Sequence, residues 1–477
     1  MKKVFLFSII ATLAIFTACK KDDESFKSPE VVAPANLTAE SGAEVDITFT
    51  FTSEGGFNSS SVSATNGTAS IKTNGTAGAT SGSIVVTYTA GSNIGAGSVT
   101  LTLTDTKNQT GSATAVISVV EEELVVNVNG NITANTTWET GKTYILESRI
   151  AVVAGITLTI EPGVIVKGQA GTGANATALL IARGGKLMAE GTASSPIIFT
   201  SVADEILPGS VASPNLEPTL NGLWGGLIIL GNAPISADAS SVQIEGIPPS
   251  DQNGLYGGSD ASDNSGIIKY VSIRHGGANI GEGNEINGLT LGGVGSGTII
   301  ENIEVVANQD DGIEWFGGTV AVKNVIIWNA GDDAVDTDQS WGGTLDNFIV
   351  VNPGDECFEL DGPEGSMEAG HILKNGTVYA GIADGLVDLD DNSIVEMSGI
   401  YFFGMKAGQD FDLNPLALTA SDLQATLPDG GVVTDYFKAG SDAFVTTVAL
   451  GANTVGADVT KFSTWSWAAV SGALTDF

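Results

Sequence analysis

Acidic residues recur at a fixed place in the second half of the chain. The recurring phrases are Asp311-Gly312-Ile313-Glu314, Asp333-Ala334-Val335-Asp336, Glu356-Cys357-Phe358-Glu359 and Asp384-Gly385-Leu386-Val387. Successive phrases begin 22, 23 and 28 residues apart. If the repeats stack at the β-strand spacing of about 4.8 Å, neighbouring carboxylates repel by roughly 3 kcal/mol per pair at an effective dielectric constant of about 20. Such a column must be hydrated, partly protonated or neutralised by cations.

These repeats offer only oxygen ligands, which favour Ca²⁺ over transition metals. The predicted calcium ligands come from three successive repeats and are Asp311, Glu314, Asp333, Asp336, Glu356 and Glu359. The chain has only two histidines, His275 and His371, and two cysteines, so a Cys/His metal cluster is excluded. The alternative to a calcium site is an ordinary solvated acidic face.

A second set of residues repeats in step with the acids and predicts the fold. Asn302, Asn324, Asn347 and Asn375 have the same spacings, and most positions two residues before and one and three residues after each asparagine are apolar. This pattern predicts two short strands joined by a bend at the asparagine, which serves the structure by bonding to its copies in adjacent coils. A third strand carries the ladder Ile313, Val335, Phe358 and Leu386. A leucine-rich repeat would need leucines at fixed sites and helix formers, which are missing.

The sequence therefore predicts an all-β protein whose main body is a right-handed parallel β-helix solenoid preceded by a small β-sandwich. Short strands with period-two alternation fill residues 31–120 and resemble an immunoglobulin-like or cadherin-like domain. That domain would act as a spacer or, alternatively, as a carbohydrate-binding module. Three glutamates at 121–123 mark the boundary, and residues 125–477 form the β-helix with its C-terminal cap.

The first residues read as an export signal. Lys2 and Lys3 precede a short apolar run, which ends in Phe16-Thr17-Ala18-Cys19. Small residues before a cysteine resemble the lipobox of bacterial lipoproteins. The resemblance implies a signal peptide at 1–18, an acylated Cys19 and a tether at 19–34. The charged residues 20–24 resemble the surface-export signal of Bacteroidota lipoproteins, which implies an outer-membrane protein, anchored by lipid and exposed at the cell surface.

The charge of the chain limits its partners. It has 55 acidic and 19 basic residues, for a net charge of −36. This excess excludes nucleic acid and disfavours other polyanions unless a cation bridges them. With Cys19 acylated, Cys357 has no disulfide partner and is expected to be a small buried hydrophobe.

A stretch of the repeat region also resembles the polygalacturonase-type glycosidases. The similar phrases are Asn308-Gln309-Asp310-Asp311 and, one coil later, Gly331-Asp332-Asp333. The resemblance implies Asp311, Asp332 and Asp333 as catalytic acids of an inverting hydrolase. The chain departs from that family by having Gly354-Asp355-Glu356 where a Gly-His-Gly is expected, and by lacking the following Arg-x-Lys. A lyase would need a base, for which Lys323 and Lys374 are the nearby candidates.

Three tryptophans complete the candidate site. Trp315, Trp328 and Trp341 could stack on sugar rings or could instead pack turns. The repeat block and the ending Trp465-Ser466-Trp467-Ala468 resemble a broad group of Bacteroidota β-helix lipoproteins, a resemblance that implies fold and location rather than a mechanism. The predicted function is thus a surface β-helix that binds a glycan or a surface protein, with calcium as a possible cofactor. The alternative is a surface polysaccharide hydrolase or lyase.

Overall fold

The computed structural model describes residues 26–278, 286–411 and 418–477. The predicted signal peptide and Cys19 lie outside these described residues. The chain divides into two compact units between Glu123 and Leu124. None of the described helices has the length and apolar character needed to cross a membrane.

The described part of the first unit contains two four-stranded sheets, ordered β1-β3-β6-β5 and β2-β8-β7-β4. Their strands are β1 (Glu30–Val32), β2 (Leu37–Glu40), β3 (Glu44–Thr52), β4 (Phe57–Thr65), β5 (Gly67–Thr73), β6 (Ser81–Ala90), β7 (Gly95–Asp105) and β8 (Thr110–Val120). Alternate residues of β3, β6 and β7 are buried, and Phe49, Tyr88 and Leu101 are fully buried in one shared core. Period-two alternation thus folds into two sheets that face each other across an apolar layer.

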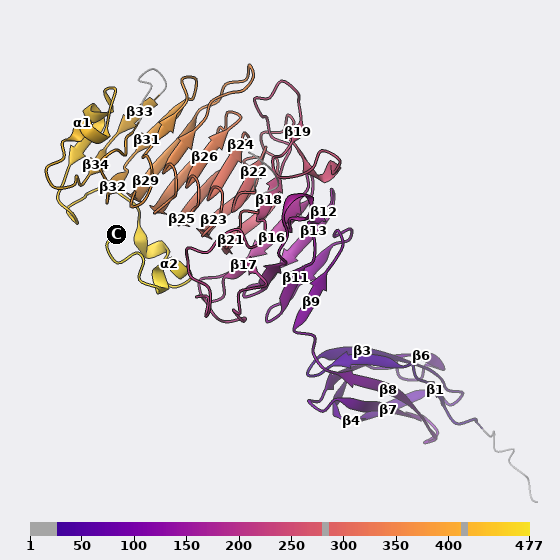
Figure 1. The fold of residues 1–477 in the computed structure, drawn as a ribbon. Helices are drawn as coiled ribbons and strands as arrows, with labels where there is room; N and C mark the ends of the chain where they lie inside the picture. Colours follow the sequence, from indigo (N-terminus) through magenta and orange to yellow (C-terminus); the bar gives the residue numbers. More distant parts are fainter. Residues whose placement is uncertain (1–25, 279–285, 412–417) are drawn as a thin grey trace, which may run out of the picture. The chain divides into compact units, whose positions relative to one another are not determined.

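In the described part of the second unit, two long parallel sheets run side by side (Figure 1). The longer has 17 strands: β9 (Val125–Val128), β10 (Thr136–Trp138), β11 (Thr143–Leu146), β13 (Thr157–Ile160), β14 (Ile165–Gly168), β16 (Lys186–Glu190), β17 (Ile197–Ser201), β21 (Gly266–Arg274), β23 (Ile299–Val306), β25 (Ala321–Trp328), β27 (Thr344–Val351), β29 (His371–Tyr379), β31 (Val395–Ser398), β32 (Tyr401–Phe403), β33 (Leu418–Ser421), β34 (Leu423–Ala425) and β35 (Val445–Thr447). The other has eight: β12 (Ile150–Val152), β15 (Leu179–Ile181), β18 (Leu227–Leu230), β22 (Leu289–Gly292), β24 (Ile313–Phe316), β26 (Val335–Asp338), β28 (Phe358–Leu360) and β30 (Asp388–Leu389). Successive coils from β12 to β30 contribute strands to both sheets, so the predicted parallel β-helix is confirmed.

The remaining elements are short and lie in connections. They are η1 (Gly173–Asn175), β19 (Val242–Gln243), η2 (Gln252–Gly254), β20 (Leu255–Tyr256), α1 (Val433–Tyr436), η3 (Ser441–Phe444), η4 (Val459–Lys461) and α2 (Trp467–Val470). The antiparallel pair β19–β20 belongs to a long insertion between β18 and β21.

The asparagine corner forms as its spacing predicts. Asn302, Asn324, Asn347 and Asn375 all have positive φ angles, between 57° and 64°. The Asn324 side chain donates to Asn302 Oδ1 at 3.0 Å, and Asn347 donates to Asn324 Oδ1 at 2.8 Å. Asn375 departs from the ladder, because its amide donates instead to Asp346. Asparagine tolerates this left-handed conformation, so the column both bends the strand and bonds the coils together.

One position of the predicted third-strand ladder is shifted. Ile313, Val335 and Phe358 pair in register and are fully buried. On the next coil, however, Glu359 pairs with Asp388 and Glu356 bridges to Gly385. This register places Val387 rather than Leu386 opposite Phe358. The connection before β30 is therefore one residue longer than the repeat spacing predicted.

The C-terminal segment lies along the outer side of the 17-stranded sheet. Trp465 and Trp467 join a buried cluster with Ile326, Trp328 and Ile349, which are the outward-facing apolar residues of β25 and β27. Two backbone amides fix the segment in place: Asp458 N donates to Asn347 Oδ1 at 2.6 Å, and Ala468 N donates to Glu304 Oε1 at 2.8 Å. The segment covers an apolar face that the coils alone would leave exposed.

Candidate functional site

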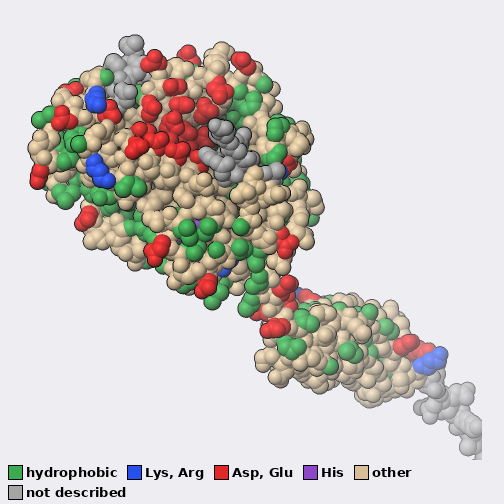
Figure 2. All heavy atoms as spheres, in the orientation of Figure 1, with side chains coloured by type: hydrophobic (Ala, Val, Ile, Leu, Met, Phe, Trp, Pro, Cys, Tyr) green, Lys and Arg blue, Asp and Glu red, His purple; other side chains and the backbone are tan. Residues whose placement is uncertain are grey.

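A column of carboxylates crosses the outer face of the eight-stranded sheet. The strand register places Thr290, Glu314, Asp336, Glu359 and Asp388 in one row, each on a successive coil. Because Ile313 and its equivalents point into the solenoid, these alternate residues point outward. Figure 2 shows the acidic side chains gathered over this face of the second unit. We call this row, with the acids of the turn before it, the acidic column.

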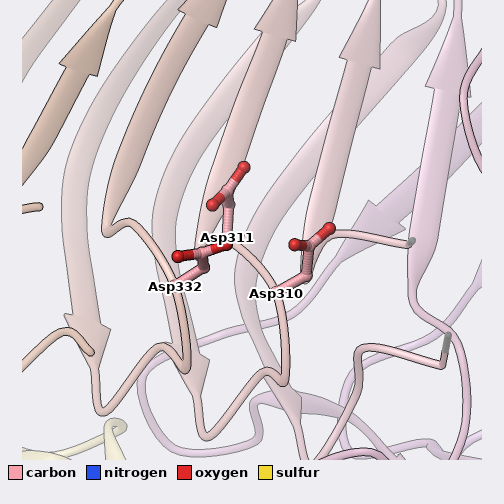
Figure 3. Close-up of side chains that lie close together, drawn as sticks. All are labelled: Asp310, Asp311 and Asp332. Atoms are coloured by element: carbon pink, nitrogen blue, oxygen red, sulfur yellow. The ribbon is translucent and has the colours of Figure 1, made fainter. Parts of the chain in front are cut away.

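The turn that precedes each strand adds further carboxylates. Asp310 and Asp311 stand before β24, and Asp332 and Asp333 stand before β26. Figure 3 shows Asp310, Asp311 and Asp332 on two neighbouring turns. Carboxylate oxygens of these three residues lie within 4.8 Å of one another. Oxygens of Asp311, Glu314 and Asp336 form a second such group. Asp311 belongs to both groups and links the turn to the strand.

Two of the aspartates also hold the coils together. Asp311 Oδ1 accepts from the backbone amide of Asp333 at 3.0 Å, and Asp333 Oδ1 accepts from that of Glu356 at 2.6 Å. Each carboxylate thus bonds its own coil to the next, a structural role that was not predicted from the sequence. Asp311 also offers an oxygen to both groups of candidate ligands, whereas the Asp333 side chain also contacts Glu359.

Asn287, which was not predicted from the sequence, also contacts the acidic column. Its side chain is 1 % exposed and its Nδ2 donates to Glu314 Oε2. Its Oδ1 is buried and has no hydrogen-bond partner among the described residues. A buried amide oxygen without a partner is costly unless a ligand or ion completes it. Asn287 lies just before β22, outside the repeated acidic phrases, so spacing alone could not have identified it.

Burial and mutual repulsion raise the pKa values of several acids in and beside the column. Burial, followed by the charges of neighbouring acids, holds the pKa values of Asp311, Glu314 and Asp336 well above their ordinary range. Burial and the contact with Glu359 raise the pKa of Asp333 to about 9. Burial is also the main reason why the pKa values of Asp338, Glu356 and Asp361 rise to about 7. The column therefore takes up protons or cations near neutral pH.

The basic residues proposed from the sequence lie elsewhere. Lys323 and Lys374 are on β25 and β29 of the other sheet, each within 4.0 Å of Asp346. His371 is buried and stacks on Trp341 with ring centroids 5.1 Å apart. His275 is buried and contacts Trp467 of the C-terminal segment. None of these four side chains supplies a base to the described part of the acidic column.

The burial of the three tryptophans corrects the prediction that they stack on sugar rings. Trp315 and Trp341 are 0 % and 1 % exposed and stack on each other inside the solenoid at 4.6 Å. Trp328 is 8 % exposed and packs against Trp467 on the outer side of the 17-stranded sheet. Trp315 follows the inward Ile313 by two residues, so strand alternation turns it inward. These rings fill space and offer no open face to a sugar at the acidic column.

Comparison with known proteins points to one family. The family described as "Pectate-lyase like beta helix domain" matches residues 130–383. Among solved structures, the chain is similar to a Family 28 exopolygalacturonase from Yersinia enterocolitica, with 11 % identity and a TM-score of 0.19, covering 89 % of this chain and 85 % of that one. No curated protein matches the sequence.

Proposed function

The chain belongs to the pectate-lyase-like β-helix family, and from this premise we propose that it is a cell-surface protein whose acidic column binds a glycan or a partner together with Ca²⁺. Glu314, Asp336 and Glu359 project from paired strands, and Asp311 and Asp333 lie in turns that are hydrogen-bonded to the next coil, so the coil stack sets their spacing. A binding role needs nothing beyond this preformed surface.

The observation that carries the calcium proposal is the group formed by Asp311, Glu314 and Asp336. Their oxygens lie within 4.8 Å of one another, and Asp311 and Glu314 are only 6 % and 5 % exposed. Three ionised carboxylates cannot stay this close in a buried site without a counter-charge. Ca²⁺ takes six to eight oxygen ligands from carboxylates, amides and water, and the unpartnered Oδ1 of Asn287 beside Glu314 is an amide oxygen of this kind.

Thermal unfolding of the purified protein tests this site. Ca²⁺ at about a hundred times its dissociation constant should stabilise the fold by about 2.7 kcal/mol, because the ion binds only the folded stack. Mg²⁺ should do less, since it requires tight octahedral geometry. Asp336→Asn should remove most of the calcium effect. Glu396→Gln changes an exposed acid on β31 of the 17-stranded sheet, outside the acidic column; it is the control and should keep the calcium effect. If NaCl at equal ionic strength reproduces the whole effect, the column is a screened acidic face.

Polysaccharide cleavage by a hydrolase or a lyase is the second candidate; the family favours cleavage in general, and Asp311 and Asp332 on successive turns are the candidate acids of a hydrolase. Their oxygens lie within 4.8 Å, closer than the roughly 6.5–9.5 Å between the carboxyls of inverting enzymes. This geometry disfavours the inverting mechanism that the sequence resemblance implied. Incubation with polygalacturonate and neutral polysaccharides, followed by mass spectrometry, should show no released oligosaccharides. Products that disappear in Asp332→Asn would establish the hydrolase instead.

The location is part of the same proposal. The lipobox-like Phe16-Thr17-Ala18-Cys19 and the acidic residues after it support anchoring of Cys19 in the outer membrane, with the first unit as an immunoglobulin-like spacer. Cys19→Ala should release the protein from the membrane fraction of expressing cells. Wild-type membrane retention of that variant would contradict the anchor.

A further inference from the structure

A pocket lies on the 17-stranded sheet, where the C-terminal segment crosses the asparagine corner of the coils. Its volume is about 440 Å³, within the roughly 300–1,000 Å³ of ligand sites in proteins. The coils contribute lining residues from β21, β23 and β25, and the C-terminal segment contributes residues from 460 to 465. Strand pairing holds the first set, and the hydrogen bonds of Asp458 and Ala468 fix the segment, so the pocket is preformed.

Tyr270 interrupts the asparagine row at this pocket. Lys269 pairs with Glu301 and Val271 pairs with Ile303, so Tyr270 stands opposite Asn302. Its φ of 50° is the left-handed conformation of the asparagines, which is unfavourable for a bulky aromatic residue. Tyr270 is half-buried, lines the pocket and meets the Trp465 ring edge to face at 5.7 Å. A strained residue in the place of one that fits indicates that its side chain is needed there.

The same interruption leaves the asparagine row with a free donor. Asn302 Oδ1 accepts from Asn324 at 3.0 Å, so the Nδ2 of Asn302 is turned the other way, toward the coil of Tyr270. Tyr270 has no side-chain amide to continue the row, and no acceptor for this Nδ2 is found among the described residues. Asn302 is only 7 % exposed but lines the pocket. A ligand oxygen that accepts from Nδ2 would complete the row.

Charges balance around this pocket, in contrast with the acidic column. Each lysine at or beside it has a carboxylate within 4.0 Å, in the pairs Lys269–Glu301, Lys323–Asp346 and Lys461–Asp458. The pocket thus offers ammonium and carboxylate groups together, as donors and acceptors of hydrogen bonds, without a strong field of either sign.

We propose that this pocket binds an uncharged hexose unit of a glycan, with one face of the sugar against Tyr270, one hydroxyl accepting from Asn302 Nδ2, and other hydroxyls bonded to Lys323 and Glu301. Sugar hydroxyls both donate and accept, so they suit a lining of paired ammonium and carboxylate groups, and the C–H face of the ring suits an aromatic side chain. The inference goes beyond the proposed function, because it concerns the other sheet and requires no Ca²⁺.

Other ligands fit the lining less well. A uronate would place its carboxylate beside lysines whose charges Asp346 and Asp458 already balance, on a chain of net charge −36. An amino sugar would meet Glu301, the one carboxylate among the described lining residues, which already lies 3.3 Å from Lys269 Nζ. An apolar ligand would cover the polar groups without bonding to them, which is costly.

Hexasaccharides that differ in charge test the proposal. The 1,4-linked hexamers of glucose, mannose and galactose are the uncharged probes, and those of galacturonate and glucosamine are the charged ones. Binding to the full chain is measured by calorimetry in the presence of a chelator, so that the calcium site does not contribute. We expect at least one uncharged probe to bind at least tenfold more tightly than either charged probe. Equal or tighter binding of a charged probe, or no binding of any uncharged probe at millimolar concentration, would overturn the proposal.

Tyr270→Asn is the sharpest variant, because asparagine tolerates a φ of 50° and continues the row. The change removes the ring and supplies an acceptor for Asn302 Nδ2. Affinity for the uncharged probe should therefore fall at least tenfold while the protein still folds. A purely structural role of Tyr270 predicts the reverse, with unchanged affinity and a lower Tm from the lost contact with Trp465.

A matched pair of lysines gives a second test. Lys323 and Lys374 both lie within 4.0 Å of Asp346, but of the two only Lys323 lines the pocket. Lys323→Met should weaken binding of the uncharged probe by roughly three- to tenfold, and Lys374→Met should leave it unchanged. Equal effects would refute the pocket. If Asp336→Asn abolishes binding and Tyr270→Asn does not, the glycan binds at the acidic column, which would uphold the proposed function and overturn this inference.

Discussion

Two buried glutamates of the solenoid, Glu304 on β23 and Glu314 on β24, differ in how their negative charge is compensated. Glu304 is fully buried and its carboxylate is completely partnered: Arg274 Nη2 lies at 3.5 Å, Ser272 Oγ donates at 2.5 Å and Ala468 N donates at 2.8 Å. Glu314 is 5 % exposed; among the described residues its one donor is Asn287, and the like charges of Asp311 and Asp336 lie next to it.

The difference separates a buried charge that the fold balances from one that it leaves unbalanced. At Glu304 the chain supplies the counter-charge itself and uses it to fasten the C-terminal segment, whose Trp467 ring lies 5.0 Å from the Arg274 guanidinium. The negative charge of Glu314 has to be neutralised from solution, by a proton or a cation. A fold keeps such an arrangement at a cost in stability, which supports our proposal that the acidic column is the functional surface.

The largest effect should come from breaking the ion pair. Arg274→Met leaves the buried Glu304 without its counter-charge, and we expect a loss of about 3–5 kcal/mol in the free energy of unfolding, measured with denaturant. Arg274→Met combined with Glu304→Leu removes the unpaired charge and should recover a large part of the loss. If the double variant is as unstable as the single one, the pair contributes packing rather than charge balance.

The stability that the acidic column contributes should decrease as pH rises, the opposite of ordinary acid denaturation. Its raised pKa values mean that the folded protein holds protons which the unfolded chain releases. The stability that this contributes is fully present below the ordinary carboxyl pKa and is lost as pH rises through the folded values of about 7 and about 9. In chelator, the Tm of the protein should therefore fall by several degrees between about pH 5 and about pH 9.

Asp336→Asn provides the control for that pH effect. Removing one charge from the middle of the row relieves repulsion on both sides, so the metal-free variant should lose less stability at high pH than the wild type. Ca²⁺ should cancel the fall in wild type only. A Tm that rises steadily from pH 5 to pH 9 would show that the acids are solvated and that the contrast with Glu304 is absent.

The repeat made the solenoid and its asparagine and acid rows predictable, because one period fixes which residues stack. Strand alternation from Ile313 also predicts that Trp315 points inward. The prediction of sugar binding followed from its aromatic side chain instead and overlooked this alternation. Other features lie outside the period. Val387 replaces Leu386 in the ladder through a longer connection, and the insertion between β18 and β21 has no counterpart in the repeat. Long-range contacts of this kind leave no local pattern in a single sequence.

The smallest expected effect concerns the asparagine row, which is a stacked polar ladder without charge. Asn324 is 8 % exposed, has a φ of 57°, donates to Asn302 and accepts from Asn347. Asn324→Ala removes both hydrogen bonds and places a methyl side chain in the left-handed conformation, so we expect a loss of about 1–2 kcal/mol in the free energy of unfolding. Asn324→Gly removes the same bonds but adopts that φ without strain, so the difference between the two variants isolates the backbone contribution. Because the row lies on the 17-stranded sheet, neither variant should change the calcium-induced shift of Tm. An unchanged Tm together with a lost calcium response would assign the asparagine row to function, and the division between structural and functional ladders would then have to be redrawn.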